Sequence, residues 1–233
     1  MSGVTEEKPE SGDRGEDLAL VHRRMDDMYR MQRHIYDLTR RYYLFGRDRL
    51  IEDLGARPGE TVCEVGCGTG RNLVLLARRY PETRFMGLDA SEEMLKSARA
   101  KLAGAGLTER VTLSHGFAER FDPRASFGLD GSLDRVVFSY SLSMIPPWRE
   151  SIEHALGALK PGGEIHIVDF GDQAGWPRWF RAVLFKWLDL FGVHYRPELP
   201  AYLREMNDSG RAQVTFTQIA RGYGFLARVR VKG

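Results

Sequence analysis

Three glycines, Gly66, Gly68 and Gly70, stand at alternate positions between a short apolar run and a helix-like pattern. Glycine is favoured where the backbone takes unusual torsion angles or approaches a ligand closely, so this stretch predicts a loop folded against a bound molecule. A dinucleotide-binding loop would place its third glycine at position 71, which is Arg71 here. The spacing therefore disfavours a nicotinamide cofactor. The loop then either binds a different cofactor or is a glycine-rich turn between two core elements.

Acidic side chains flank this loop in the sequence. Glu64 belongs to the apolar run, and Asp89 ends the next strand-like segment. Asp89 lies about twenty residues past the glycine turn, where an acid usually holds ribose hydroxyls in nucleotide-binding α/β folds. The two cysteines, Cys63 and Cys67, fall in the predicted strand and in the turn after it, with no histidine cluster beside them. We expect neither a disulfide nor a metal site, which fits a reducing cytosol.

Alternating strand-like and helix-like segments predict the elements that position these residues. We expect helices over 45–54 and 91–102, the second capped by Ser91, and strands over 62–65, 83–88, 111–115, 135–139 and 164–169. Two further strand-like runs, 214–219 and 225–231, are close enough to pair as a hairpin and would make one strand antiparallel. This alternation predicts an α/β fold whose mostly parallel sheet has helices on both faces.

The chain of 233 residues is long enough for one such domain. We expect a disordered tail over 1–16, an N-terminal helical lid over 17–57 and the main domain over 58–233. The formal net charge is +2, with no separation into acidic and basic halves, so we expect no nucleic-acid partner. No run resembles a signal peptide or is long enough to span a bilayer.

Four features together resemble the class I S-adenosylmethionine-dependent methyltransferases. They are the glycine motif, Asp89, residues 134–146 and the Leu-Lys-Pro-Gly-Gly turn over 159–163. The resemblance implies S-adenosylmethionine as cofactor and a Rossmann-like fold, with a seven-stranded, mostly parallel sheet. The cofactor-binding residues that it implies are Glu64, Gly66, Cys67, Gly68, Gly70, Asp89, Ala90, Phe117, Ala118 and Ser139.

One position departs from the family pattern. The loop after the third strand often reads Gly-Asp-Ala in the family, and its aspartate meets the adenine amino group. Here the loop reads Gly116-Phe117-Ala118. The resemblance then implies that Phe117 stacks on the adenine ring, or that the backbone of Ala118 makes the contact.

Further segments are similar to the bacterial betaine-lipid methyltransferases. They are 28–50 and 176–187, the second followed by 221–223. These enzymes methylate diacylglyceryl-homoserine, so the resemblance implies successive N-methylation of an amino-lipid headgroup to the trimethylated betaine lipid. It implies a cytoplasmic enzyme, peripheral to the inner membrane. Phosphatidylethanolamine, a quinone precursor or a small soluble amine are alternative acceptors, and a cofactor-binding protein without catalysis is a further alternative. The sequence leaves the oligomeric state open.

Methyl transfer to an amine needs a neutral nitrogen and a well-aligned approach rather than a protein nucleophile. His34 and Asp37 are candidates for a weak base or for binding the ammonium, and Tyr29, Tyr36 and Tyr140 for aromatic walls that tolerate a quaternary ammonium. Tyr43 is a further candidate wall. Hydrogen bonding within the lid and core packing are the alternative roles.

The segment 176–189 predicts a very apolar helix with a thin, mostly basic stripe. At about 100° per residue, Arg178, Arg181, Lys186 and Asp189 fall within an arc of roughly 140°. Such a helix either lies in a membrane interface, with its cations meeting anionic lipid, or covers the sheet and is buried on most sides.

Overall fold

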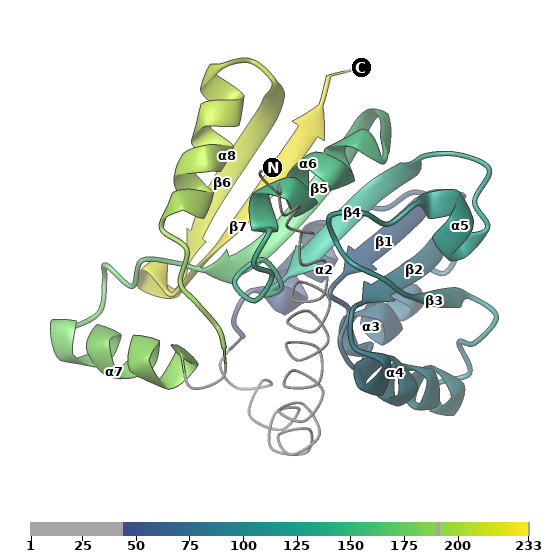
Figure 1. Ribbon diagram of the computed structural model, residues 1–233, viewed down its shortest axis with the longest axis horizontal. Helices are drawn as coiled ribbons and strands as arrows, with labels where there is room; N and C mark the ends of the chain where they lie inside the picture. The colour runs from purple at the N-terminus through teal and green to yellow at the C-terminus, as the bar shows by residue number, and fades with distance from the viewer. Residues whose placement is uncertain (1–43, 190–191, 233) are drawn as a thin grey trace, which may run out of the picture.

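The computed structural model describes residues 44–189 and 192–232 of the chain (Figure 1). In chain order its elements are α2 (Arg47–Asp53), β1 (Thr61–Val65), α3 (Arg71–Arg79), β2 (Arg84–Asp89), α4 (Glu92–Gly104), β3 (Val111–His115), α5 (Pro123–Phe127), β4 (Leu133–Ser139), α6 (Trp148–Gly157), β5 (Leu159–Phe170), α7 (Arg178–Asp189), α8 (Glu198–Asp208), β6 (Ala212–Ile219), η1 (Ala220–Gly222) and β7 (Gly224–Val231).

The strands form one seven-stranded sheet in the order β3-β2-β1-β4-β5-β7-β6. β1 pairs in parallel with β2 and β4, and the parallel pairing continues to β3 on one side and β5 on the other. β7 is antiparallel to both of its neighbours, β5 and β6. The predicted fold, with one antiparallel strand contributed by the C-terminal hairpin, is therefore confirmed.

Helices cover both faces of the sheet and enclose two apolar cores. On one face, Val136 and Phe138 of β4 pack with apolar residues of α5, α6 and α8. On the other face, Val137 belongs to a core that contains residues of α2, α3 and α4. Successive strand residues point to opposite faces, so a strand buried on both sides must be apolar throughout. This explains the apolar residues Val62, Cys63 and Val65 of β1, which are buried, and makes the buried Glu64 between them an exception.

β5 begins earlier than the sequence predicts. The residues expected to form a turn over 159–163 instead form the bulged start of the strand: Leu159 pairs with Leu133, and the register shifts before Glu164 pairs with Arg135. Gly162 has a φ of +76°, which suits a bulge. Lys160 also holds this segment, because its Nζ lies 2.8 Å from Oδ2 of Asp134.

α7 is largely exposed. Within the helix only Leu188 is buried, whereas Trp179 and Val183 are 70% and 63% exposed. The alternative of a sheet-covering helix, buried on most sides, is therefore wrong. The interfacial alternative stays a prediction. None of the described helices has both the length and the apolar character needed to cross a membrane.

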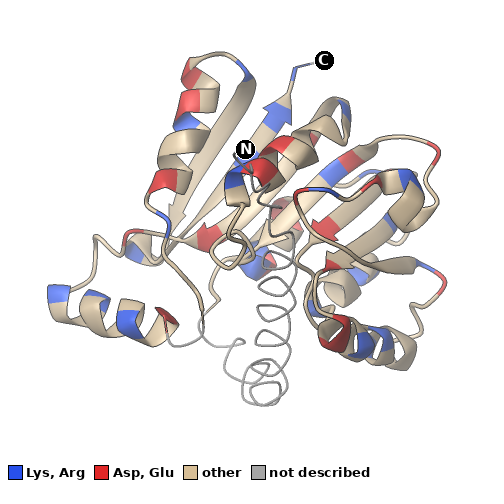
Figure 2. Cartoon of the chain, viewed as in Figure 1, with Lys and Arg blue, Asp and Glu red and all other residues tan. Residues whose placement is uncertain are grey.

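Most of the segment predicted as a lid lies outside the described residues, as does the predicted tail over 1–16. The described part contains α2, which contributes Leu50 and Ile51 to the core shared with α3. Lys, Arg, Asp and Glu are interspersed over the visible elements in Figure 2, as expected from the balanced composition.

Candidate active site

The glycine loop connects β1 to α3 at the edge of the sheet where the parallel strands end. Gly66, Gly68 and Gly70 have φ angles of +73°, +53° and +71°, a region that side chains other than glycine adopt at a cost. The amides of Gly66 and Cys67 donate to the Leu88 carbonyl at 2.8 and 3.0 Å. These bonds fix the loop between β1 and the end of β2.

Two of these glycines also permit close approach to neighbouring elements. A Cβ on Gly66 would lie 2.6 Å from Cβ of Ser141, in the segment after β4. A Cβ on Gly70 would lie 3.0 Å from Cβ of Ala98 in α4. The loop is therefore packed between the ends of β1 and β4 and the helix α4, and a side chain at Gly66 would displace it.

Asp89, at the end of β2, joins the glycine loop to α4. Its Oδ2 accepts a hydrogen bond from the Gly68 amide at 2.7 Å, and its Oδ1 accepts one from the Ser91 amide at 2.9 Å. Ser91 in turn caps α4, as predicted, by accepting from the Met94 amide. The structure thus gives Asp89 a loop-holding role that the sequence did not indicate, while its contact with a ribose stays a prediction.

Glu64 is buried beside the glycine loop, with only 2% of its surface exposed. Its Oε1 accepts a hydrogen bond from Nδ2 of Asn72 at 2.8 Å, whereas its buried Oε2 accepts none from the residues that the structure describes. Burial raises the pKa of this carboxyl to about 8. A buried acceptor without a donor is costly, and the α-ammonium of S-adenosylmethionine is a donor of suitable charge. Glu64 therefore fits the cofactor implied by the sequence.

The residues predicted to border adenine lie on and near the loop after β3. Phe117 is half-buried, and the guanidinium carbon of Arg120 lies 4.2 Å from its ring centroid. Nε2 of His115 lies 3.0 Å from the carbonyl of the exposed Ala90, which ties this loop to the end of β2. Ala118 is buried in the core. Whether Phe117 stacks on adenine stays a prediction.

Tyr140 follows β4 and has a φ of +56°, which is uncommon for a residue other than glycine. Its hydroxyl donates to the Phe45 carbonyl at 2.5 Å, and its ring packs edge-on against Phe170 at 4.7 Å between centroids. The structure thus uses Tyr140 to connect the end of β4 with the segment before α2. Its role as an aromatic wall stays a prediction, as does the role of Ser139, whose Oγ is buried without a hydrogen bond to any described residue.

The other predicted catalytic residues lie outside the described residues. They are Tyr29, His34, Tyr36 and Asp37, together with the candidate wall Tyr43.

Sequence reasoning missed Asp169, a buried acid at the end of β5. Its Oδ2 accepts from the Ser143 amide at 3.1 Å and its Oδ1 from the Phe170 amide at 2.8 Å. Burial raises the pKa of Asp169 to about 6. It holds the segment after β4 against β5, as Asp89 holds the glycine loop. The signal that could have found it is an acid at the end of a predicted strand. That signal identified Asp89 at the end of β2, and it holds equally for Asp169 in β5.

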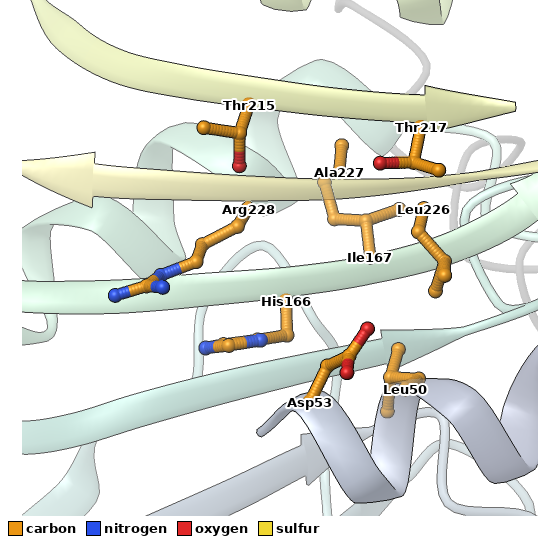
Figure 3. Close-up of a pocket in the computed structure, with 9 residues that line it drawn as sticks. All are labelled: Leu50, Asp53, His166, Ile167, Thr215, Thr217, Leu226, Ala227 and Arg228. Atoms are coloured by element: carbon orange, nitrogen blue, oxygen red, sulfur yellow. The ribbon is translucent and has the colours of Figure 1, made fainter. Parts of the chain in front are cut away.

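A cavity of about 290 Å³ lies away from this edge, between α2 and the strands β5, β6 and β7 (Figure 3). His166 and Arg228 are its basic side chains, and both contact Glu164. None of its lining residues comes from the glycine loop. Within the described ranges no group of His, Cys, Asp and Glu is arranged to hold a metal ion.

A family model described as a methyltransferase domain matches residues 62–163, which contain the glycine loop, Asp89 and β4. A demethylmenaquinone methyltransferase of Listeria monocytogenes serotype 4a is 29% identical over 159 residues, covering 67% of this chain and 65% of its own. A ubiquinone/menaquinone biosynthesis C-methyltransferase of Klebsiella pneumoniae is 29% identical over 182 residues, covering 76% of this chain and 68% of its own. The chain thus spans about 65% of the length of the Listeria relative.

Solved structures share the fold. An O-methyltransferase family protein from Burkholderia thailandensis has a TM-score of 0.62 at 22% identity, over 91% of this chain and 59% of its own. A SAM-dependent methyltransferase from Aquifex aeolicus has a TM-score of 0.61 at 18% identity, over 82% of this chain and 93% of its own. With the glycine loop and the sheet order, these findings show that the chain carries a class I S-adenosylmethionine-dependent methyltransferase domain, with S-adenosylmethionine as its cofactor.

Proposed function

We propose that the protein methylates a ring carbon of a quinol precursor that carries a lipid tail. The observation that carries this proposal is the similarity to relatives named for demethylmenaquinone and for ubiquinone/menaquinone C-methylation. Those names favour the quinone-precursor alternative over successive N-methylation of diacylglyceryl-homoserine, which was the main expectation from the sequence.

The aromatic side chains near the site suit a flat acceptor. Tyr140 and Phe170 lie 4.7 Å apart between ring centroids, Phe170 and Tyr223 6.0 Å, and Tyr223 and Phe45 5.1 Å. This row ends at Phe45, which is 50% exposed and could therefore receive a further ring. Aromatic rings gain from stacking or edge contacts at about 4.5–7 Å between centroids. Tyr140, Phe170 and Tyr223 are buried against one another, so within this row it is Phe45 that supports binding of a fused quinol ring.

The proposed reaction needs no protein nucleophile. When bound, the cofactor supplies a methyl group on a positively charged sulfur. A quinol hydroxyl would lose its proton to water, which raises electron density at the neighbouring ring carbon. That carbon would take the methyl group as the sulfur–carbon bond breaks. The ring proton would then pass to water to restore aromaticity, and the ring oxygen would regain a proton, so that one proton is released in total. Positioning and exclusion of water are then the main contributions of the protein.

The described residues supply part of that positioning. Glu64 would attract the ammonium of the cofactor, because its buried Oε2 lacks a donor among the described residues. Asp89 holds Gly68, and Asp169 holds the segment after β4 through Ser143. The two loops that border the site are therefore each fixed by a carboxylate at the end of a strand.

The experiment that tests the proposal is a comparison of acceptors. Purified full-length protein is incubated in detergent micelles with methyl-labelled S-adenosylmethionine and, in separate reactions, demethylmenaquinol, diacylglyceryl-homoserine or phosphatidylethanolamine. We expect label in the quinol product, with the new methyl group on carbon by mass spectrometry. Label in an amino lipid would overturn the proposal in favour of N-methylation. Binding of cofactor without transfer to any acceptor would favour a non-catalytic role. The Asp89→Ala variant serves as the cofactor-site control.

A further inference from the structure

One face of α7 points away from the core and is both apolar and basic. Trp179 and Val183 lie about one turn apart and are 70% and 63% exposed. Arg178, Ala182 and Lys186 are also exposed. At about 100° per residue, these five side chains share an arc of roughly 140°. We call this arc the outer face of α7.

The opposite side of the helix is held by the protein. Leu188 is buried, and Leu184, Phe185 and Trp187 pack against the core that α2, α3 and α4 share. The ring of Phe185 stacks on Tyr195 at 5.1 Å between centroids. These contacts attach the helix to the core without using the outer face.

The exposed large hydrophobic side chains are not scattered. Among the described residues they are Phe45, Trp179 and Val183. Phe45 contacts Tyr223, the residue that follows η1. The start of α7 is attached to the same turn, because Nε1 of Trp176 donates to the carbonyl of Ala220 in η1 at 3.0 Å.

Figure 1 shows α7 beyond the edge of the sheet where the parallel strands end, which is also the edge that carries the glycine loop. The helix carries Arg178, Arg181 and Lys186 against one acid, Asp189, and Figure 2 shows these basic bands along it. The outer face thus combines the exposed side chain of Trp179 with an excess of positive charge, at the same end of the sheet as the glycine loop.

We propose that the outer face of α7 docks on a membrane that contains anionic lipid. In this arrangement Trp179 and Val183 enter the headgroup boundary, and Arg178 and Lys186 meet lipid phosphates. This inference rests on the proposed function, because it takes the acceptor to be a lipid. Docking at this face would present the edge of the sheet that carries the glycine loop to the bilayer. A second copy of the chain fits less well, because a two-fold contact would bring the same cations together.

The test uses the full chain with vesicles that contain neither quinol nor cofactor, so that it is independent of methyl transfer. Flotation is measured with phosphatidylcholine vesicles and with vesicles containing phosphatidylglycerol. We expect the protein to float with the second kind. Arg178→Gln and Lys186→Gln should each weaken partitioning by about fivefold. Trp179→Asp combined with Val183→Asp should abolish it.

Ala103→Asp is the matched control, since it adds an acid to an exposed position of another helix, α4. This variant should bind like the original protein, and all variants should keep the methyl-transfer rate in detergent micelles. Absence of binding to any vesicle, or equal binding by the Trp179/Val183 variant, would overturn the inference. So would a dimer in sedimentation that the same variant dissociates, since the outer face would then bind a second copy.

Discussion

The Gly68 amide donates to Oδ2 of Asp89 at 2.7 Å, so the end of β2 holds the middle of the glycine loop. The other carboxylate oxygen accepts from Ser91 at 2.9 Å. Both oxygens of Asp89 therefore face backbone donors, and the shape of the loop depends on both.

Replacing Asp89 with Asn should weaken cofactor binding. An amide offers one oxygen, so either Gly68 or Ser91 would face an NH₂ group instead of an acceptor. We expect a loss of about 1–3 kcal/mol, or roughly five- to 150-fold in Kd, measured by titration calorimetry with S-adenosylmethionine. Asp130→Asn, at an exposed position after α5, is the control and should leave Kd unchanged. Equal affinities for the two variants would show that the loop does not need Asp89.

Gly66→Ala should destabilise the fold more than Gly59→Ala. Both residues have positive φ, +73° and +80°, but a Cβ on Gly66 would lie 2.6 Å from Cβ of Ser141, whereas one on Gly59 would meet no atom within 4 Å. The shared backbone cost is about 1–2 kcal/mol, and the clash should add about 1–3 kcal/mol for Gly66 alone. Urea unfolding measures the difference. Equal losses of unfolding free energy in the two variants would mean that the segment after β4 moves to accommodate the new Cβ without loss of stability.

The carboxyl of Glu64 should make stability depend on pH. Its pKa is raised to about 8 by burial, whereas an unfolded glutamate titrates at about 4.3. Between these values the unfolded state binds fewer protons, so the free energy of unfolding of the cofactor-free protein should fall as pH rises, and level off above about pH 8. Glu64→Gln should remove this part of the slope in urea unfolding at several pH values. If the free energy of unfolding depended on pH in the same way in both proteins, the raised pKa of Glu64 would be contradicted.

The same residue predicts proton release on cofactor binding. The cofactor's ammonium favours the ionised form of Glu64, so binding near pH 7 should release on the order of one proton. Calorimetry in buffers of different ionisation enthalpy measures this number. The release should disappear in Glu64→Gln, and a release that persists would have to come from another group.

Tyr140→Phe should loosen the segment before α2 while keeping the ring. The variant removes the bond from the Tyr140 hydroxyl to the Phe45 carbonyl, at a cost of about 1 kcal/mol. Hydrogen exchange should become faster in α2. Tyr202→Phe, which removes a hydroxyl bonded to Glu153 at an exposed position, should leave exchange in α2 unchanged. Faster exchange in both variants would point to a general loss of stability.

The strands were predictable because burial on both faces makes them continuous apolar runs between turn residues. β3 has the predicted bounds, and β4 begins two residues before its predicted start at 135. The start of β5 was not predictable in this way, since Pro161, Gly162 and Gly163 are turn-forming residues that here form a bulge held by Lys160 and Asp134. Local composition does not reveal a bulge stabilised by a neighbouring strand.

The site was predictable where backbone conformation demands a residue type, as at Gly66 and Gly70. The hydrogen bonds that the Gly68 amide donates to Asp89 and the Ser143 amide donates to Asp169 join residues that are far apart in sequence. The spacing of about twenty residues placed Asp89 near the glycine loop but predicted a ribose contact rather than a bond to Gly68, and no such rule covers Asp169 and Ser143. The exposure of α7 was likewise ambiguous, because an apolar helix with a thin charged stripe suits either a core or an interface.

The position of β7 between β5 and β6 constrains the order of events during synthesis. β6 leaves the ribosome before β7, yet β7 is its one pairing partner among the described strands and joins it to the rest of the sheet. Until β7 emerges, β5 presents an unpaired edge, and β6 has no strand to join. A nascent chain paused in this interval would expose two open strand edges, which makes it a substrate for chaperones and a hazard for aggregation.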